Sequence, residues 1–479
     1  MRLVSRQQLR FFQKNIQHAF PVFLAMLVGG GVGGLAVIAN NASSKWAVVI
    51  ILAVIAPTVV LLVNDIKKLI FIVLLVDMSF GIDIAIRNQG WHRGGPTGYM
   101  VSLMTIALIV GYALWIIEQK PRLQFFPQVT IPALLYLFMI AISFFQSPNL
   151  QLSAFGFFLE CQTFLMYFYI VNHIKTWSDV RLIVIAAVIC LLLESVLMAF
   201  QYFAGATLDI GGLITSEAIT EGGVGVTGAR VSGTLGRPGN AALYLNSMLA
   251  LTLGAYLTDK LVDKRLALGT LSLGVIALIG TSSRGGWVAF IVAMLLIIGR
   301  VAWTEAGKKV AWVFLLSGLL IVLFWGQIQQ RLLTIQDDRT RERLDTMAYN
   351  IIKDYPLGVG ENTYDLHMSD KYAHPDMVGH THLPVHNRYL MVWAETGLHG
   401  LIAFGLLLIA PFWQARRWLL KTSVAPHLVI LGTGLLGGLV THIVHMRSEN
   451  FNGRAQIQLL WFLIAMTVVV NQLISQTEK

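Results

Sequence analysis

The chain has 479 residues, of which 56% are hydrophobic and 13% are charged. Soluble domains carry about 25% charged residues, so this composition excludes a soluble globular protein and indicates a protein that crosses a membrane several times. The net charge is +10, but most basic residues flank apolar stretches. Nucleic acid is therefore not an expected partner.

Apolar stretches of about 20 residues, the length that crosses a bilayer, recur along the chain. Before Ala204 they are predicted at 19–39, 46–63, 69–86, 99–117, 130–145, 154–171 and 182–203. After it they are predicted at 241–257, 266–280, 287–303, 310–325, 398–413, 428–445 and 457–474. The first is longer than the apolar part of a signal peptide, so we interpret it as an uncleaved helix. The predicted fold is all-α, a polytopic bundle of about 12–14 transmembrane helices.

These stretches divide the chain into four segments. Residues 1–203 are predicted to form the N-terminal transmembrane helices, and residues 204–325 the central ones with arginine-bearing outer loops. Residues 326–385 form one large loop, and residues 386–479 the C-terminal transmembrane helices.

The distribution of lysine and arginine predicts the orientation. With a cytoplasmic N-terminus, 20 of the 35 Lys and Arg residues fall in cytoplasmic segments and eight in short outer loops. Basic residues favour the cytoplasmic side, and long loops do not count in this rule. Both termini are therefore predicted to be cytoplasmic, and the large loop extracytoplasmic.

After Lys45, every basic residue in the short outer loops is arginine. The planar guanidinium binds phosphate oxygens in a bidentate way, which indicates a phosphate-bearing ligand on this face. For Arg87, Arg93, Arg447 and Arg454 taken alone, contact with lipid headgroups or solvent is the preferred interpretation.

Two arginine-bearing segments are more specific. GARVSGTLGRPGNAALY (228–244) places Arg230 and Arg237 among glycines before a predicted helix, and TSSRGGW (281–287) places Ser283 and Arg284 at another helix start. Backbone N–H groups in glycine-rich turns and at helix N-termini bind anions. An ordinary Gly/Pro loop and a snorkelling arginine are the structural alternatives.

The end of the large loop is rich in histidine. His386, followed by Asn387, lies at the predicted outer end of the next helix, where a neutral imidazole is suited to act as a general base. A metal site is less favoured, because no familiar ligand spacing accompanies it. Structural hydrogen bonding is expected for His374, His380 and His382.

Three carboxylates, Asp77, Glu160 and Glu194, interrupt apolar stretches. Because charges are costly against lipid, these side chains are expected to face the bundle interior. A structural contact with a neighbouring helix and a proton relay in a transporter are about equally consistent with this position.

Four motifs in order resemble the bacterial O-antigen ligase family, which shares a fold with O-antigen polymerases. ARVSGTLGRPGNAALYL resembles the family's Arg-x-SGT segment, and TSSRGGW its SRGG element. RLDTMAYNIIKDYPLGVG (343–360) resembles its arginine, helix and PxxGVG sequence, with Met347 where tryptophan is frequent. His386-Asn387, nine residues, Gly397, two residues and Gly400 resemble its histidine signature.

The resemblance implies a GT-C-like, inverting glycosyltransferase of the bacterial inner membrane, with its active site facing the periplasm. It would use neither metal nor cofactor, and would move a glycan from undecaprenyl pyrophosphate to a hydroxyl of lipid A core. An O-antigen or exopolysaccharide polymerase and a protein O-oligosaccharyltransferase use the same donor chemistry and remain alternatives. A transporter of lipid-linked saccharides and a scaffold protein are alternatives from other classes.

The resemblance also implies roles for individual residues. His386 would be the base, and Arg230 and Arg284 would hold the pyrophosphate, with Arg237 a weaker candidate. Supporting positions are Asn387, which would orient the base, Arg343, which would anchor the large loop or touch the glycan, and Ser283.

Overall fold

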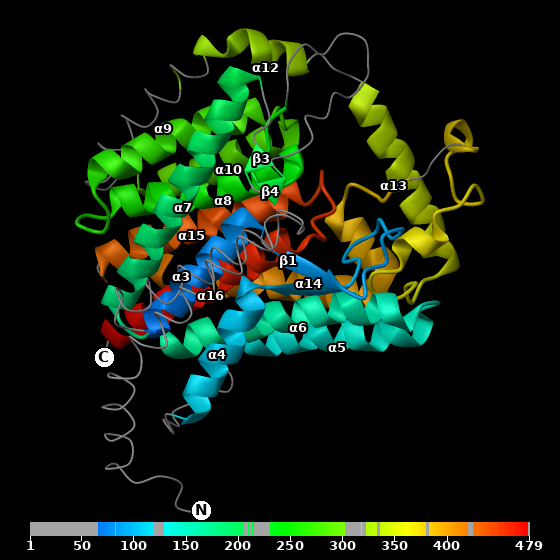
Figure 1. The fold of residues 1–479 in the computed structure, drawn as a ribbon, viewed down its shortest axis with the longest axis horizontal. Coiled ribbons are helices and arrows are strands. Elements are labelled where there is room, and N and C mark those ends of the chain that lie inside the picture. The colour runs from blue at the N-terminus through cyan, green and yellow to red at the C-terminus, as the bar shows by residue number, and fades with distance from the viewer. Residues whose placement is uncertain are drawn as a thin grey trace, which may run out of the picture. The chain divides into compact units, whose positions relative to one another are not determined.

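The structure is a computed structural model of the chain (Figure 1). It describes residues 66–81, 83–117, 129–205, 209–210, 213–214, 230–301, 318, 322–332, 336–379, 383–419 and 425–477. The predicted spans at 19–39 and 46–63, and most of 310–325, lie outside these residues, as do His380 and His382. The chain divides into two compact units, residues 1–69 with 208–214 and residues 70–207 with 215–479. All predicted site residues belong to the second unit.

The described part of the chain is predominantly α-helical, as predicted. Its helices are α3 (Ile66–Phe80), α4 (Leu103–Ile117), α5 (Thr130–Ser143), α6 (Leu150–His173), α7 (Trp177–Ala204), α8 (Pro238–Leu257), α9 (Lys264–Gly280), α10 (Arg284–Val301), α12 (Trp325–Leu332), α13 (Gln336–Asp354), α14 (Arg388–Leu419), α15 (Pro426–His445) and α16 (Arg454–Thr477). Six of these, α6, α7, α10, α14, α15 and α16, are long and apolar enough to cross a membrane. The protein is therefore an all-α, polytopic membrane protein.

Two predicted spans have different ends from those expected. The helix predicted at 69–86 stops at Phe80, and β1 (Asp83–Ile86) follows it. This strand pairs antiparallel with β2 (Tyr99–Ser102), which precedes α4 and was predicted as its first turn. Alternate residues of β1 are exposed, so the segment has the two-residue period of a strand. A second short pair joins β3 (Asp209–Ile210) and β4 (Leu213–Ile214).

Local sequence defines several helix ends. The Asn149 side chain accepts from the backbone N–H groups of Gln151 and Leu152 at the start of α6. Thr176 and Asp179 form a reciprocal capping box at the start of α7. Such caps satisfy N–H groups that have no partner within the helix.

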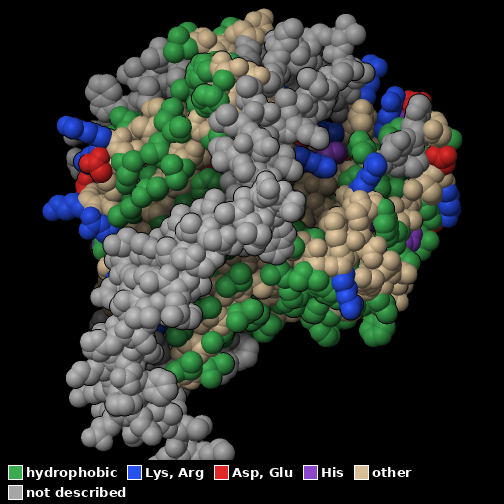
Figure 2. All heavy atoms as spheres, viewed as in Figure 1, with side chains coloured by type: hydrophobic (Ala, Val, Ile, Leu, Met, Phe, Trp, Pro, Cys, Tyr) green, Lys and Arg blue, Asp and Glu red, His purple; other side chains and the backbone are tan. Residues whose placement is uncertain are grey.

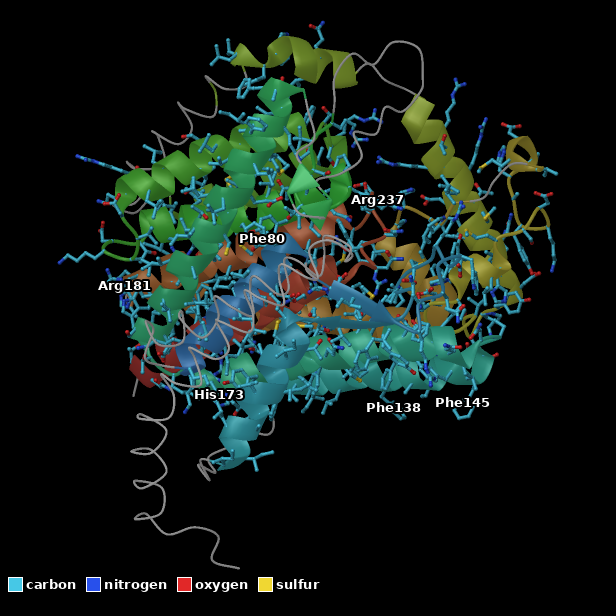
Figure 3. The ribbon with its side chains drawn as sticks, in the orientation of Figure 1. Phe80, Phe138, Phe145, His173, Arg181 and Arg237 are labelled. Carbon is cyan, nitrogen blue, oxygen red and sulfur yellow. The ribbon has the colours of Figure 1, made fainter. Side chains whose placement is uncertain are left out.

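The helix that organises the site is α15. It packs against α8, α10 and α16, and α14 packs against α5. Gly254 of α8 and Gly434 of α15 face each other so closely that a Cβ on either would lie 2.9 or 2.8 Å from the other's Cα. Small residues allow this approach of two helix backbones in a membrane protein. In Figure 1, α5 and α6 run side by side. Figure 3 shows Phe138 of α5 and Phe145, in the short 3₁₀ turn that follows α5, pointing outward.

The three intramembrane carboxylates face the interior, as predicted. Asp77, Glu160 and Glu194 are each at most 2% exposed. Asp77 pairs with Arg454, and Glu194 accepts from the backbone N–H of Thr234 at 2.7 Å. The expectation of a solvent or headgroup contact is wrong for Arg454, because it is buried between Asp77 and Asp83. Buried charges require such partners.

Glu160 belongs to a second buried network. Trp461 Nε1 donates to Glu160 Oε2 at 3.1 Å, and Arg388 Nη2 lies 3.5 Å from Glu160 Oε1. A cavity of about 10 Å³, close to the smallest that holds one water, is lined by these three residues, by Gln456 and by apolar neighbours.

The large loop has a small core of its own. Met347, Ile351 and Tyr364 are buried there against Met391 of α14. The short helices η2 (Tyr364–His367) and η3 (Pro375–Met377) follow α13. His374 Nδ1 accepts from the Asp376 N–H at 3.2 Å, the structural role expected of this histidine.

Two of the sequence motifs interlock at the base of this loop. Val359 and Gly360 donate their N–H groups to the carbonyls of Ala394 and Glu395, both at 2.9 Å. Gly358 has φ +92°, and Gly397 interrupts α14 with φ +71° and ψ 178°. A Cβ on Gly397 would lie 2.8 Å from the Leu357 carbonyl. Glycine is required because these backbones touch, so Gly358 of the PxxGVG sequence and Gly397 of the histidine signature have a structural role.

Candidate active site

The predicted site segments meet at residues 445–449, which comprise the last residue of α15 and the turn that follows it and are called the turn below. Ser283 Oγ, just before α10, lies 3.4 Å from His445 Nε2. Gly285 faces Ser448 so closely that a Cβ there would be 3.0 Å from the Ser448 Cβ. The TSSRGGW segment, with Arg284 as the first residue of α10, is therefore packed against this turn.

The first arginine segment is joined to TSSRGGW. Arg230 Nε donates to the Thr281 carbonyl at 3.1 Å, and the Val231 N–H donates to the Gly280 carbonyl at the same distance. The two segments that carry Arg230 and Arg284 thus lie side by side. Because the guanidinium of Arg230 is anchored through Nε, its direction is fixed by the backbone of the neighbouring segment.

The same segment then brings the start of α8 to the turn. Arg237 occupies the N-cap position, with Pro238 in the first turn. A Cβ on Gly239 would clash with the Glu449 carboxylate, so α8 begins directly beside this side chain. Arg237 is exposed and has no ion pair with the residues that the structure describes. Figure 3 shows it at the start of α8.

His386 reaches the turn from the other side. Its Nδ1 lies 3.2 Å from Glu449 Oε2, and its side chain is 27% exposed. The backbone is fastened next to it, because the Arg388 N–H is shared between the carbonyls of Met446 and Glu449 at 2.9 and 3.0 Å. Asn387 uses its side chain to accept from the Tyr389 N–H at 3.1 Å. Asn387 therefore caps α14 and fixes the backbone that carries His386.

Two arginines make ion pairs within or with the large loop. Arg343 donates to Asp376 at 2.7 Å, a contact within the loop itself. Arg447 of the turn pairs with Asp345 of α13 at 3.0 Å. This pair joins α13 to the turn. Arg341 of the same helix lies close enough to Glu449 for its positive charge to lower the pKa of the carboxyl. Figure 2 shows Lys or Arg side chains next to a His side chain in a hollowed region of this face.

Electrostatics keep Glu449 ionised. Burial by itself would raise the pKa of this carboxyl, but the hydrogen bond from His386 and the positive charge of Arg341 lower it below its usual value. The site therefore combines the carboxylates of Glu449 and Asp345 with a histidine and several arginines. Such a set suits binding of a phosphate-bearing ligand together with proton transfer. Within the described residues, no group of three or more His, Cys, Asp or Glu side chains is arranged to hold a metal ion.

Glu449 was not identified from the sequence. It is the one acidic residue between Met446 and Arg454, in a short loop between two apolar spans. The sequence feature that could have identified Glu449 as a site residue is a single carboxylate among arginines in a predicted outer loop. Its pairing with a histidine 63 residues away in the chain could not be inferred from spacing.

One comparison with known proteins identifies a family. Residues 269–405 match the family described as O-antigen ligase. The match covers Arg284, the large loop and His386, whereas Arg230 and Arg237 precede it. No curated protein sequence matches the chain. The match confirms the resemblance, and the chain is a polytopic membrane protein with an O-antigen ligase family domain at residues 269–405.

Proposed function

We propose that this protein is an inverting glycosyltransferase that moves a glycan from undecaprenyl pyrophosphate to an acceptor hydroxyl, without a metal ion. The acceptor of a ligase of this kind is the lipid A core. The site is expected to face the periplasm in the bacterial inner membrane, because the loops that build it carry few lysines and lie opposite the lysine-rich loops.

The observation that carries the proposal is the meeting of three segments at residues 445–449. The segments of Arg230 and Arg284 are hydrogen-bonded to each other, and the second packs on His445 and Ser448. His386 contacts Glu449, the next residue of the same turn. The segments that carry the proposed base and the proposed phosphate-binding groups thus come from parts of the chain that are far apart in sequence.

The proposed reaction is a single displacement. His386 takes the proton of the acceptor hydroxyl while its oxygen bonds to the anomeric carbon, and the bond from that carbon to the pyrophosphate oxygen breaks. Arg230 and Arg284, with Arg237 at the entrance to α8, stabilise the negative charge on the departing pyrophosphate. Attack on the face opposite the leaving group inverts the anomeric centre.

Reconstitution tests this proposal. The purified protein is mixed with a polyprenyl-pyrophosphate-linked glycan and lipid A core in the presence of a chelator, and glycan transfer is followed on gels. His386→Ala should reduce transfer about 10²–10⁴-fold, and Arg284→Ala about 10²–10³-fold. Arg93→Ala is the matched control, because this exposed arginine lies in another outer loop. Full transfer by His386→Ala would refute the assignment of the base.

The acceptor is identified in the same assay by exchanging it. A single transfer to lipid A core indicates a ligase, a ladder on a second lipid-linked glycan indicates a polymerase, and transfer to a serine or threonine peptide indicates a protein O-oligosaccharyltransferase. Absence of transfer to any of them, together with gradient-driven movement of the donor across vesicles, would instead favour a transporter.

A further inference from the structure

The contact between His386 and Glu449 has the geometry of a base held by a second group. Nδ1 of the imidazole and Oε2 of the carboxylate are 3.2 Å apart, and Glu449 is 16% exposed. A carboxylate can only accept a hydrogen bond, so the hydrogen of a neutral imidazole is placed on Nδ1. Nε2 is then left with its lone pair, as a general base requires.

The position of the carboxylate is fixed by the start of α8 and by the backbone of α14. Gly239 of α8 leaves room for the Glu449 side chain, where any larger residue would clash. The Glu449 carbonyl accepts from the Arg388 N–H at 3.0 Å, so the backbones of the base and of its partner are joined. The first turn of α8, a helix of 20 residues, faces the carboxylate, and the partial positive charge of a helix N-terminus favours an anion there.

The titratable and charged groups around this pair come from α13, α15 and the turn. His445 of α15 and Arg341 of α13 act on Glu449, and Asp345 of α13 lies within electrostatic range of His386. Arg447 in turn pairs with Asp345 at 3.0 Å. Because the permanent charge of Arg341 and the hydrogen bond from His386 favour its ionised form, Glu449 remains a carboxylate and does not compete with His386 for the acceptor proton.

We infer that Glu449 is a positioning residue, which selects the tautomer of His386 and stabilises the imidazolium formed when the acceptor is deprotonated. This inference rests on the proposed function and deepens it. It also gives α8 a role in the site, because the first turn of α8 packs against the Glu449 carboxylate through Gly239.

The test compares three substitutions in the reconstituted transfer assay. Glu449→Gln is nearly isosteric, but its amide can donate to Nδ1 and thereby place the hydrogen on Nε2. We expect kcat to fall about 10- to 1,000-fold with KM for the donor nearly unchanged. Glu449→Ala should be impaired to a similar degree, and Glu449→Asp should recover part of the loss. The acidic limb of the pH–rate profile should move to lower pH in the Gln and Ala variants, because the imidazolium loses its counter-charge.

A purely structural role predicts a different result. Glu449→Gln would then keep wild-type kcat and pH profile, and that outcome would overturn the inference. The matched control is Asp263→Asn, which alters another carboxylate at a helix N-terminus, at the start of α9. If the wild-type protein transfers no glycan, the proposed function itself is refuted. If the wild type is active and His386→Ala is inactive but Glu449→Gln is fully active, only the role of Glu449 is refuted.

A second variant moves the carboxylate without removing it. The added methyl group of Gly239→Ala displaces the Glu449 side chain, so kcat should fall while the unfolding temperature changes little. Gly269→Ala in α9 is the control, since a Cβ there meets nothing within 4 Å. Equal kcat in the two glycine variants would also count against the inference.

Discussion

Replacing Arg388 by methionine removes a guanidinium that neutralises a buried cluster of carboxyl groups. Arg388 is 4% exposed, and its Nη2 lies 3.5 Å from both Glu160 Oε1 and the Tyr136 hydroxyl. Glu361 and Glu395 also act on it electrostatically, and all three carboxylates are at most 6% exposed. Methionine fills much of the volume but leaves this cluster without its positive charge.

The cost follows from burial. Removing one member of a buried ion pair destabilises a protein by about 3–5 kcal/mol, because the remaining charge keeps its desolvation penalty. Glu160 retains its bond from Trp461 Nε1 at 3.1 Å, which places the expected cost toward the lower end of this range. For a chain of this length the entropy of unfolding is roughly 1 kcal/mol per kelvin, so the unfolding temperature should fall by about 3–5 °C.

Thermal unfolding of the detergent-purified protein measures this effect. Arg447→Gln is the matched control, because Arg447 is 66% exposed in its pair with Asp345 and a surface pair contributes about 0–1 kcal/mol. Adding Glu160→Gln to Arg388→Met should recover part of the loss, since the two residues are coupled. An unfolding temperature of Arg388→Met equal to wild type would refute the reasoning that this cluster depends on its arginine.

Three further predictions concern the buried carboxyls and the large loop. Burial, with the charge of Glu160 nearby, raises the pKa of Glu361 to about 7, so the folded protein binds a proton that the unfolded chain has released. The free energy of unfolding should therefore fall as pH rises from about 5 to about 8, and Glu361→Gln should flatten this dependence in thermal unfolding. Glu194→Gln should retain glycan transfer, because Glu194 accepts from the Thr234 backbone, whereas loss of transfer with unchanged folding would favour a relay function. Asp345→Asn should weaken the contact of α13 with Arg447 and speed proteolysis of the large loop, and equal cleavage rates would contradict this role.

Much of the fold was predictable from hydropathy alone. Apolar stretches of bilayer length identify spans whatever their partners, and the interior positions of Asp77, Glu160 and Glu194 followed from the cost of charge in lipid. The helix predicted at 69–86 was too long, because the apolar residues of Asp83–Ile86 fit a helix or a strand equally well until the pairing with β2 is known.

The sequence by itself determined that this is a polytopic membrane protein, and it identified the arginine- and histidine-bearing segments as candidates for the site. Those features depend on composition, length and residue chemistry, which are local. The tertiary structure decided which groups meet: Glu449 with His386, Arg454 with Asp77, and Arg388 with Glu160. These pairs depend on how α8, α14, α15 and α16 pack. Packing is set by contacts between residues that are far apart in the chain, and the spacing of residues along the sequence does not determine which of them meet.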